Sequence, residues 1–346
     1  MISTKESKAL PDIVREFSHR RILVVGDAIA DQFVYGEISR VSREAPVFIL
    51  RHEHTETAPG GAANCAANLT ALGARVSLIS VVGKDEPGTE LLRKLDSAGV
   101  DCSGVVVSPN QRTTTKVRVL AGQSHSTRQQ VIRIDYDGKT DFDGKLRDQI
   151  TGQLTAGVQS ADAMIISDYG YGVGDPSVTE TVRTAGGVAG IPILVDSRFR
   201  LSGFSGLMSA TPNEDELVHL IGHEPADVGE LEAAGGELCQ HLDYRALLIT
   251  RGSNGMMLIE PGKKPLHIAA VGPHEPVDVT GAGDTVIATY ALALASGASF
   301  AQAAQLANLA GGAVVMKRGT ATVTAEELTA AALGQNQGAA QVIGSG

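Results

Sequence analysis

The chain has 346 residues, of which 43% are hydrophobic and 20% are charged, and it contains 40 glycines and no tryptophan. This is the composition of a globular protein with a large core, built as one large α/β domain or two smaller ones. The net charge of -10 argues against a general binder of nucleic acid or anionic membranes. An anionic substrate held locally by a few cations and backbone amides remains compatible with it.

Several features indicate a protein of the reducing cytoplasm. The cysteines Cys65, Cys102 and Cys239 are odd in number and far apart, so neither a disulfide framework nor a metal motif is implied. Residues 1–20 are polar and are expected to form an N-terminal extension or helix without a signal-peptide core. No run of 18 apolar residues predicts a membrane span. The Gly- and Gln-rich residues 334–346 predict a disordered tail.

The first predicted strand covers residues 21–27 and ends at a glycine turn. Asp31 lies just beyond it, where α/β enzymes bind ligands, although it would also suit a turn or cap. Residues 34–40 and 46–52 predict β ribbons of a small projecting element. Within it, His52-Glu53-His54 has metal-ligand residue types, but we interpret these residues as solvated positions of an exposed strand.

A second glycine-rich turn at residues 58–64 precedes a predicted helix over 65–72. Asn64 would fall in the first helical turn, where it either binds a hydroxylated ligand or caps the helix. A strand over 76–83 and a helix over 85–98 follow. Residues 104–136 are again β-like. We expect them to pair with the earlier ribbons as a small sheet, a lid formed from about 33–56 and 104–136.

The second half continues the alternation of strands and helices. Helices are predicted over 143–160, 178–187, 231–242 and 300–317, and strands over 163–169, 193–196, 246–252 and 255–259, with a strand-end, turn and helix start at 210–217. Such alternation predicts a mostly parallel sheet with helices on both faces. We therefore expect one three-layer α/β/α domain over residues 21–333, with the lid inserted.

The stretch Asp278-Val279-Thr280-Gly281-Ala282-Gly283-Asp284-Thr285 directly precedes an apolar, helix-like run. Its glycines would let the backbone approach a ligand closely, and the amides and dipole of the helix start favour an anion there. Asp284 would then be placed to take a proton from an attacking hydroxyl. Alternatively, Asp284 is only a helix N-cap after a tight turn.

Other nucleotide and catalytic motifs are missing from the sequence. There is no Gly-x-x-x-x-Gly-Lys-Ser/Thr loop, and Gly170-Tyr171-Gly172-Val173-Gly174 has the wrong spacing for a dinucleotide fingerprint. His-Glu-x-x-His, Cys-x-x-Cys and Gly-x-Ser-x-Gly are also absent.

Four motifs in order resemble the ribokinase/PfkB family of sugar kinases. They are Gly60-Gly61-x-x-Asn64, Asn213-x-x-Glu216, Thr250-x-Gly252 and Asp278-x-Thr280-Gly281-Ala282-Gly283-Asp284. The resemblance covers residues 21 to about 330. It implies a ribokinase-like fold, a phosphotransferase activity with ATP and Mg²⁺, and a sugar bound under the lid.

A narrower resemblance is to the heptose 7-phosphate kinase branch, the kinase half of the bifunctional heptose kinase/adenylyltransferase. It rests on the segments Gly26-Asp27 with Asp31, residues 39–47, Pro59 to Asn64, residues 132–136 and Ser167-Asp168-Tyr169. Those kinases transfer the γ-phosphoryl of ATP to O1 of D-glycero-β-D-manno-heptose 7-phosphate, for a lipopolysaccharide precursor. This sequence has Asp196-Ser197-Arg198 where that branch commonly has Asp-Pro-Lys. No adenylyltransferase segment follows, so we expect a stand-alone kinase.

The family resemblance also implies a role for each matching residue. Asp284 would be the base, and the amides of Gly281, Ala282 and Gly283 the anion hole. The substrate would contact Asp31, Gly60, Gly61, Asn64, Arg133, Asp168 and Arg198. ATP would contact Asn213, Glu216, Thr250, Gly252, Gly255, Gly283 and Asn308, with Glu216 meeting Mg²⁺ through water. Asp278 and Thr280 would hold a monovalent cation, K⁺. Structural alternatives remain for three of these residues, namely a surface arginine for Arg133 and capping for Asp278 and Asn308.

Two other functions compete with the heptose phosphate kinase. One is a PfkB kinase for another sugar, sugar phosphate or nucleoside, and the other is a binding protein of the same fold that has lost catalysis. We expect a cytoplasmic homodimer, because lid ribbons such as 117–120 would expose β edges that a second lid can cover. No nucleic-acid or membrane partner is expected.

Overall fold

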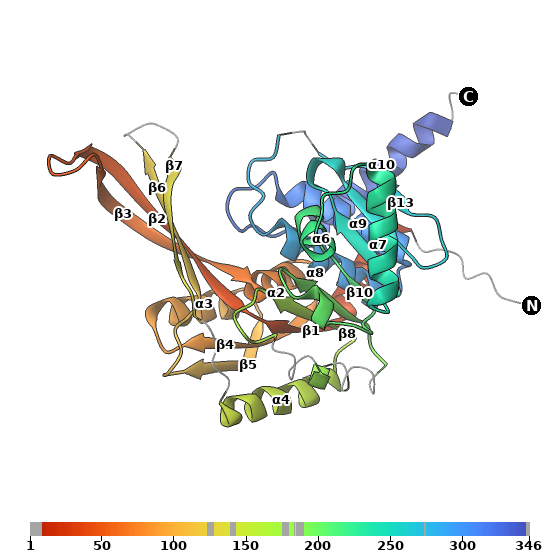
Figure 1. Cartoon of the computed structure of the whole chain (residues 1–346), viewed down its shortest axis with the longest axis horizontal. Coiled ribbons are helices and arrows are strands. Elements are labelled where there is room, and N and C mark those ends of the chain that lie inside the picture. The colour runs from red at the N-terminus through yellow and green to blue at the C-terminus, as the bar shows by residue number, and fades with distance from the viewer. Residues whose placement is uncertain are drawn as a thin grey trace, which may run out of the picture.

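The computed structural model describes residues 9–122, 128–138, 143–174, 180–182, 184, 190–272 and 275–343. Most of the helix predicted over 178–187 lies outside these residues. Within them the chain forms a large α/β body, from which a narrow sheet of four strands projects (Figure 1).

The body is built on a nine-stranded sheet in the order β13-β12-β11-β10-β9-β8-β1-β4-β5. The seven strands from β11 to β5 are parallel, and β12 and β13 are antiparallel at one edge. The strands are β1 (Arg21–Gly26), β4 (Arg75–Gly83), β5 (Asp101–Ser108), β8 (Ala163–Asp168), β9 (Ile193–Ser197), β10 (Ser209–Ala210), β11 (Ala246–Thr250), β12 (Met256–Ile259) and β13 (Leu266–Ile268).

Helices cover both faces of this sheet because its central strands are apolar on both sides. In β1, Ile22 and Val24 enter one core, and Leu23 and Val25 enter the other. The first core contains residues of α1 (Leu10–Arg15), α2 (Ala62–Ala71), α3 (Glu86–Ser97), α8 (Ala282–Ala295), α9 (Phe300–Val314) and α10 (Ala325–Ile343). The second contains residues of α4 (Gly144–Val158), α6 (Glu214–Ile221) and α7 (Val228–His241). The predicted three-layer α/β/α architecture is confirmed.

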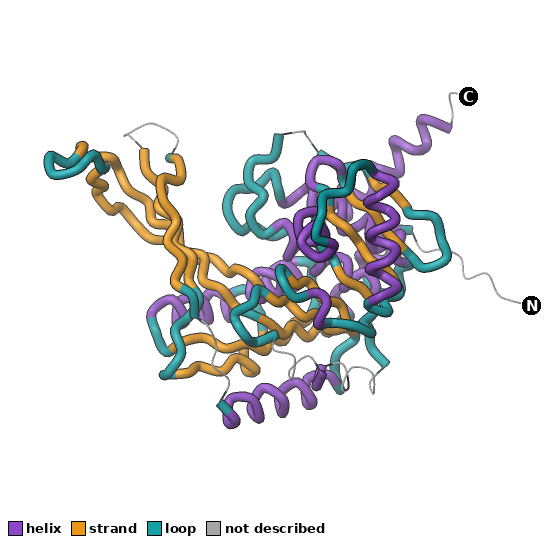
Figure 2. The backbone as a smooth tube through the Cα atoms, viewed as in Figure 1, coloured by secondary structure: helices purple, strands orange, loops and turns teal. Residues whose placement is uncertain are grey.

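The lid is a separate four-stranded sheet in the order β3-β2-β6-β7. Its strands are β2 (Ala28–Val41), β3 (Phe48–Gly61), β6 (Thr115–Gly122) and β7 (Gln129–Tyr136). The pairs β2/β3 and β6/β7 are antiparallel, whereas β2 and β6 are parallel. In Figure 2 the lid is almost entirely strand and stands away from the helices of the body.

The structure differs from the predicted lid in two respects. Residues 104–108, expected in the lid, belong to β5, which pairs with β4 in the central sheet. The reason is that Val105 and Val106 each pack against one of the two cores. The ribbon 117–120, expected to be a sheet edge, lies in β6 between β2 and β7, so β3 and β7 are the lid edges.

The N-terminal segment includes helix α1, and the C-terminal helix α10 extends past residue 333. Ile13, Val14 and Phe17 of the N-terminal segment are buried in the first core, where α1 packs near α10. Residues 334–343, expected to be disordered, continue helix α10. Their alanines and glutamines favour a helix once the preceding turns have formed.

Adjacent glycines in α7 provide a test of the packing between this helix and the sheet. A Cβ on Gly235 would overlap the Cδ1 atom of Ile259 and lie 2.8 Å from that of Ile249. A Cβ on Gly236 would meet no atom within 4 Å. We expect Gly235→Ala to destabilise the protein by about 1–3 kcal/mol through overpacking. Gly236→Ala, the control, should be neutral or stabilising by up to about 1 kcal/mol.

The measurement is the midpoint of urea unfolding for the two variants and the parent protein. Equal midpoints for the two alanine variants would contradict the tight contact between α7 and the sheet.

Candidate active site

The polar residues described below lie at one edge of the central sheet, namely the edge formed by the carboxyl ends of its parallel strands. The strands β1, β8, β9 and β11 are parallel, so their carboxyl ends lie at this edge, where open α/β sheets bind ligands. Helix α8 begins here, and its N-cap residue, Gly281, has a left-handed backbone with φ of 76°. A side chain on Gly281 would overlap the amide of Asn64, so this close approach requires glycine.

Asp284 lies in the first turn of α8 with only 2% of its surface exposed. Asn64 Nδ2 donates a hydrogen bond of 2.8 Å to Asp284 Oδ2, and the Tyr169 hydroxyl donates one of 2.9 Å to Oδ1. The Asp284 side chain makes no capping bond, and neither does Asn64 in α2. The capping alternatives for both residues are therefore wrong.

The environment of Asp284 favours a carboxyl group that can exchange a proton near neutral pH. Burial raises its pKa to about 7, although the hydrogen bonds from Asn64 and Tyr169 act in the opposite direction. Nearby, the charge of Asp31 also raises this pKa and that of Lys116 lowers it. A general base is most effective when its pKa lies near the working pH.

A chain of buried amides and hydroxyls holds Asn64 in place. Asn68 Nδ2 donates to Asn64 Oδ1 at 3.1 Å, and the Thr285 hydroxyl donates to Asn68 Oδ1 at 2.9 Å. Helices α2 and α8 are thus linked on both sides of Asp284. Such a fully bonded buried network fixes side-chain orientation.

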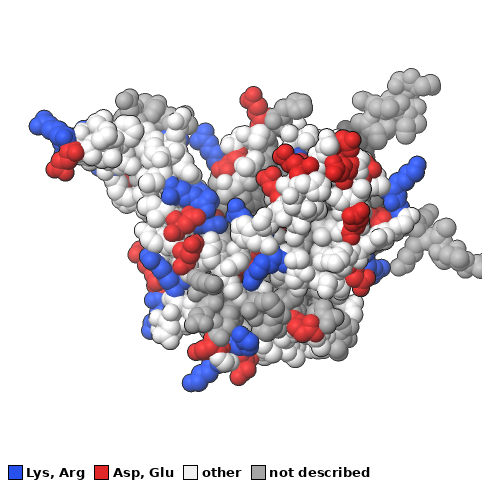
Figure 3. Space-filling model, viewed as in Figure 1, with Lys and Arg blue, Asp and Glu red and all other residues white. Residues whose placement is uncertain are grey.

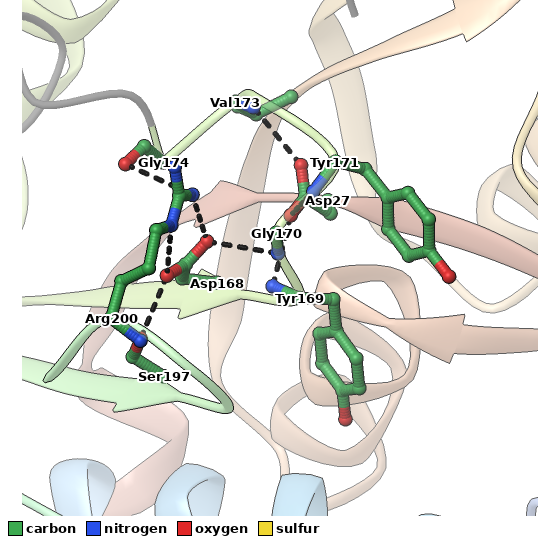
Figure 4. A network of polar contacts seen from close by, with 9 residues as sticks. All are labelled: Asp27, Asp168, Tyr169, Gly170, Tyr171, Val173, Gly174, Ser197 and Arg200. Carbon is green, nitrogen blue, oxygen red and sulfur yellow. Dashed lines mark hydrogen bonds and ion pairs between the residues drawn. The ribbon is translucent and has the colours of Figure 1, made fainter. Parts of the chain in front are cut away.

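The loop after β8, which carries Tyr169, is held by a buried carboxylate at the end of β1. Asp27 accepts hydrogen bonds from the backbone amides of Tyr169, Tyr171 and Val173 at 2.9–3.0 Å (Figure 4). Burial raises the pKa of Asp27, and these three donors lower it. Asp27 therefore positions the tyrosine that contacts Asp284, without touching Asp284 itself.

The carboxylate of Asp168, which was predicted to contact substrate, is bound by other residues of the protein. It forms an ion pair with Arg200 and accepts hydrogen bonds from the Ser197 hydroxyl at 2.7 Å and the Gly170 amide at 3.0 Å (Figure 4). Its side chain is 1% exposed. This arrangement favours a structural role, in which Asp168 joins the loops after β8 and β9.

Asp31 lies on β2 at the foot of the lid and forms a buried ion pair with Arg118 of β6. A Cβ on Gly60 would overlap the Asp31 carboxylate, and one on Gly61 would lie 2.5 Å from the Asp27 carbonyl oxygen. The two glycines, which are the last residues of β3, thus let β3 pass close to both aspartates. Burial raises the pKa of Asp31, and Arg118 opposes this shift.

Five of the residues predicted to contact ATP line one cavity of about 410 Å³ beside the start of α8. They are Thr250, Gly252, Gly255, Gly283 and Asn308, and the cavity is otherwise mostly apolar. The Asn308 side chain donates to the Ala269 carbonyl at 2.7 Å from within α9, so it does not cap a helix. An apolar cavity with a few polar groups of this size suits a small-molecule ligand.

Asn213 and Glu216, also predicted to contact ATP, do not line this cavity. They form a capping box at the start of α6, in which each side chain accepts from the other residue's backbone amide. Burial raises the pKa of Glu216, and it raises that of Asp196 well above the usual range, with further upward contributions from Glu216 and Asp284. The charge of Glu216, together with burial, thus raises the pKa of the partly buried Asp196 carboxyl, and a cation nearby would oppose that shift.

One of the three amides predicted to form the anion hole at the start of α8 is already hydrogen-bonded within the protein. The Ala282 amide donates to the Val279 carbonyl at 3.2 Å. Gly283 is exposed and lines the cavity, and a Cβ there would meet no atom within 4 Å. Space for an anion therefore exists in front of Gly283.

The loop with Asp278 and Thr280 packs against the loop after α9. Asp278 accepts hydrogen bonds from the amides of Thr280 and Gly319, at 2.9 and 3.0 Å, which is consistent with the structural alternative. The hydroxyl of Thr320, whose methyl group lies near Gly281, is buried without a hydrogen-bond partner. An unsatisfied buried oxygen is unusual and fits a cation ligand.

Arg133 lies on β7 of the lid, and Arg198 lies in the loop after β9 of the body. Arg133 of β7 forms two hydrogen bonds of 2.7 Å with Asp135 on the same strand. Arg198 is exposed, and its guanidinium lies 5.5 Å from the centre of the Phe199 ring. Figure 3 shows basic and acidic side chains close together where the lid meets the body.

The structure adds four residues for which the sequence gave no role: Asp27, Lys116, Tyr169 and Asp196. Asp27, Tyr169 and Asp196 stood in segments compared with the heptose kinase branch, whereas the signal for Lys116 lay in the strand pattern. In the β-like run 115–120, charged and apolar residues alternate, which places Lys116 and Arg118 on one face of the strand. Among the described residues, no group of three or more His, Cys, Asp or Glu side chains is arranged to hold a metal, and this includes His52, Glu53 and His54.

Residues 19–327 match the sequence model of the pfkB family carbohydrate kinases. The chain therefore belongs to this family of phosphotransferases, which act on sugar hydroxyls. No helix in the described part of the chain has the length and apolarity needed to cross a membrane.

Two curated proteins are similar to this chain over most of its length. The bifunctional protein HldE of Caulobacter vibrioides is 42% identical over 327 residues, which is 94% of this chain and 66% of the relative. That of Aeromonas hydrophila is 41% identical over 317 residues, 90% of this chain and 64% of the relative. This chain thus spans about two thirds of the length of these relatives.

Solved structures confirm the ribokinase-like fold. The ribokinase of Arabidopsis thaliana, complexed with ribose and ATP, superposes with a TM-score of 0.70 at 22% identity and covers 90% of this chain and 98% of its own. Phosphofructokinase-2 of Escherichia coli, in complex with potassium, superposes with a TM-score of 0.75 at 19% identity, covering 92% and 99%.

The hydrogen bond from Tyr169 to Asp284 predicts a change in pH dependence. If Asp284 serves as a base it must be deprotonated, and activity should then fall as the pH drops below the pKa of Asp284. Tyr169→Phe removes a donor that stabilises the carboxylate and should therefore raise this pKa. We expect the acidic limb of the kcat/KM profile to move up by roughly half to one pH unit.

Tyr244→Phe is the control, because Tyr244 is also buried but donates to the Phe204 carbonyl instead. It should leave the limb unchanged. An unchanged limb in Tyr169→Phe, with activity retained, would show that Asp284 is not the group that titrates.

Proposed function

We propose that this carbohydrate kinase transfers the γ-phosphoryl group of ATP to a sugar hydroxyl, with Asp284 as the base. The observation that supports this most directly is the position of Asp284, buried in the first turn of α8 and held by Asn64 and Tyr169. Gly283, the preceding residue, lines the cavity, and the charge of Asp31 of the lid acts on the Asp284 carboxyl.

In the proposed reaction, the sugar oxygen bonds to the γ-phosphorus as its bond to the β,γ-bridging oxygen breaks. The hydroxyl proton passes to Asp284, and ADP leaves with the bridging oxygen. Phosphoryl transfer depends mainly on alignment and charge stabilisation. Asn64 and Asp31 would orient the sugar. The Gly281 and Gly283 amides would stabilise the transferring group, since one well-placed donor contributes about 3–4 kcal/mol.

The proposal also includes binding sites for two cations. Glu216, with Asp196 nearby, would meet Mg²⁺ through water, because this ion usually keeps several of its waters. The ion would neutralise charge on the nucleotide phosphates. Asp278, Thr280 and the unpaired Thr320 hydroxyl would surround K⁺. Exchanging K⁺ for Na⁺ in the assay tests this site, and equal rates with both ions would argue against it.

We propose D-glycero-β-D-manno-heptose 7-phosphate as the acceptor, with O1 as the attacking oxygen. The motifs of the heptose kinase branch and the 40–42% identity to HldE proteins support this choice. Arg133 of the lid and Arg198 of the body, whose charges both act on Lys116, would meet the anionic substituent. A PfkB kinase for another sugar or sugar phosphate remains the second candidate, because Asp196-Ser197-Arg198 differs from the branch pattern.

We further propose a cytoplasmic homodimer formed through the lids. Ile132 and Ile134 are 53% and 41% exposed on the face of β7 opposite Arg133, and β7 is a sheet edge. Apolar side chains beside an open edge favour coverage by another surface. A monomeric mass by light scattering at micromolar concentration would contradict this assembly.

Replacement of the base provides the strictest test of the mechanism. Asp284→Asn keeps the shape of the side chain but cannot accept the proton, so kcat should fall by about 10²–10⁴-fold. The melting temperature, measured alongside, should fall little or even rise, since a buried charge is removed. Near-normal turnover would refute the assignment.

A panel of acceptors tests the substrate. Heptose 7-phosphate, hexose phosphates, free sugars and nucleosides are each incubated with ATP, and ADP release is measured. We expect the highest kcat/KM with the heptose phosphate. Activity confined to free sugars or nucleosides would refute the heptose phosphate proposal but leave the kinase mechanism intact.

A further inference from the structure

The loop after β11, residues 250–255, forms part of the wall of the cavity beside α8. Its residues Thr250 and Gly255 line that cavity. The loop is closed by its own backbone, since the Arg251 amide donates to the Gly255 carbonyl at 2.8 Å. A Cβ on Gly255 would overlap the Ile268 carbonyl oxygen, so the end of the loop lies tightly against β13. The loop therefore has a fixed shape.

Backbone contacts place the start of α6 next to this loop. The Thr250 amide donates to the Pro212 carbonyl at 2.9 Å. Thr250 also forms a parallel β-bridge with Asn213, the N-cap residue of α6. The first turn of α6 is acidic and consists of Glu214, Asp215 and Glu216. These contacts bring the acidic turn to the loop, but they act on the backbone just before the helix.

Arg251 supplies a second connection, from inside the loop to the first turn of α6. Its Nε donates a hydrogen bond of 2.7 Å to Glu214 Oε1, and the two side chains are 13% and 35% exposed. A charge-assisted bond at a partly buried position is strong and only weakly screened by salt. The apolar contacts of α6 with the second core come from Leu217, Leu220 and Ile221, after the first turn. The ion pair therefore adds a restraint at the first turn itself.

The ion pair also separates the roles of neighbouring carboxylates. Arg251 engages Glu214, whereas Glu216 accepts a hydrogen bond from the Asn213 amide at 3.0 Å. Burial and the charge of Asp215 raise the pKa of Glu216, and a cation nearby would oppose that shift. Asp215 is exposed. Glu216 is thus the partly buried carboxylate of this turn that no arginine engages directly in an ion pair among the described residues.

We infer that Arg251 is a positioning residue for the nucleotide side of the reaction. Its ion pair with Glu214 holds the first turn of α6 at the cavity, so that Glu216 and the nucleotide phosphates can share one Mg²⁺ ion. The inference rests on the proposed function, which assigns the cavity to ATP and Glu216 to Mg²⁺. Arg251 acts through α6 and needs no contact with either ligand.

The test measures how strongly Mg²⁺ and a nucleotide promote each other's binding. ADP is titrated by calorimetry into the intact protein with Mg²⁺ and with EDTA, which gives the factor by which Mg²⁺ tightens the binding of ADP. Arg251→Gln should bring this factor close to one. In the kinase assay it should raise KM for ATP roughly 10-fold and leave KM for the acceptor sugar unchanged. Arg251→Lys, which keeps the charge but lacks the fork of donors, should give an intermediate factor.

A double-mutant cycle shows whether Arg251 acts through Glu214. Glu214→Gln should cause the same loss, and the double variant should bind little worse than either single variant. Glu214→Gln also provides the comparison if Arg251→Gln does not fold, because Glu214 is the more exposed partner. Additive losses would overturn the inference, since the two residues would then act independently.

Arg93→Gln is the matched control, because it breaks an exposed ion pair with Glu90 within α3. It should leave the binding of ADP and its response to Mg²⁺ unchanged. A wild-type response in Arg251→Gln would overturn the inference and leave the proposed function intact. Equal weakening of ADP binding with and without Mg²⁺ would also overturn it, since Arg251 would then shape the cavity alone. A wild-type protein that binds no ADP would instead refute the proposed function, and the inference with it.

Discussion

The contact between Asp284 and its two donors holds three distant parts of the chain together at the site. Asn64 belongs to α2, Tyr169 to the loop after β8, and Asp284 to α8. The carboxyl group is buried, so each of the two donors reduces the cost of its charge. Asp27 and Asn68 fix those donors in turn. The same buried bonds thus link these parts of the fold and set the proton affinity of Asp284.

The sequence was sufficient for the architecture and for the parts of the site defined by local chemistry. Alternation of apolar strands and helices predicted the three layers, and the glycines before α8 predicted a close backbone approach, which Gly281 now shows. Thr250, Gly252 and Asn308, which the family resemblance implied as ATP contacts, line one cavity. These features depend on neighbouring residues or on short spacings.

Features that depend on long-range pairing could not be predicted in this way. The position of Asp168 at a strand end predicted a contact with ligand. In the structure its carboxylate is instead bound by Arg200, which lies 32 positions later in the chain. Lys116 looks like an ordinary strand lysine until the register of β6 with β2 and β7 places it among other charges. Residues 104–108 resemble lid strands in composition, and only their contact with both cores assigns them to the body.

The parallel pairing of β2 with β6 has a consequence for how the lid can form. Strands β4 and β5 and helices α2 and α3, all of the body, lie between these two lid strands in the chain. Parallel neighbours need such a crossover, and contacts between distant residues form slowly. The lid is therefore not a contiguous module that could be excised or transplanted. Its two hairpins are separated in the chain by elements of the body and are joined only by long-range pairing, whereas the cavity beside α8 is lined by residues of the body alone.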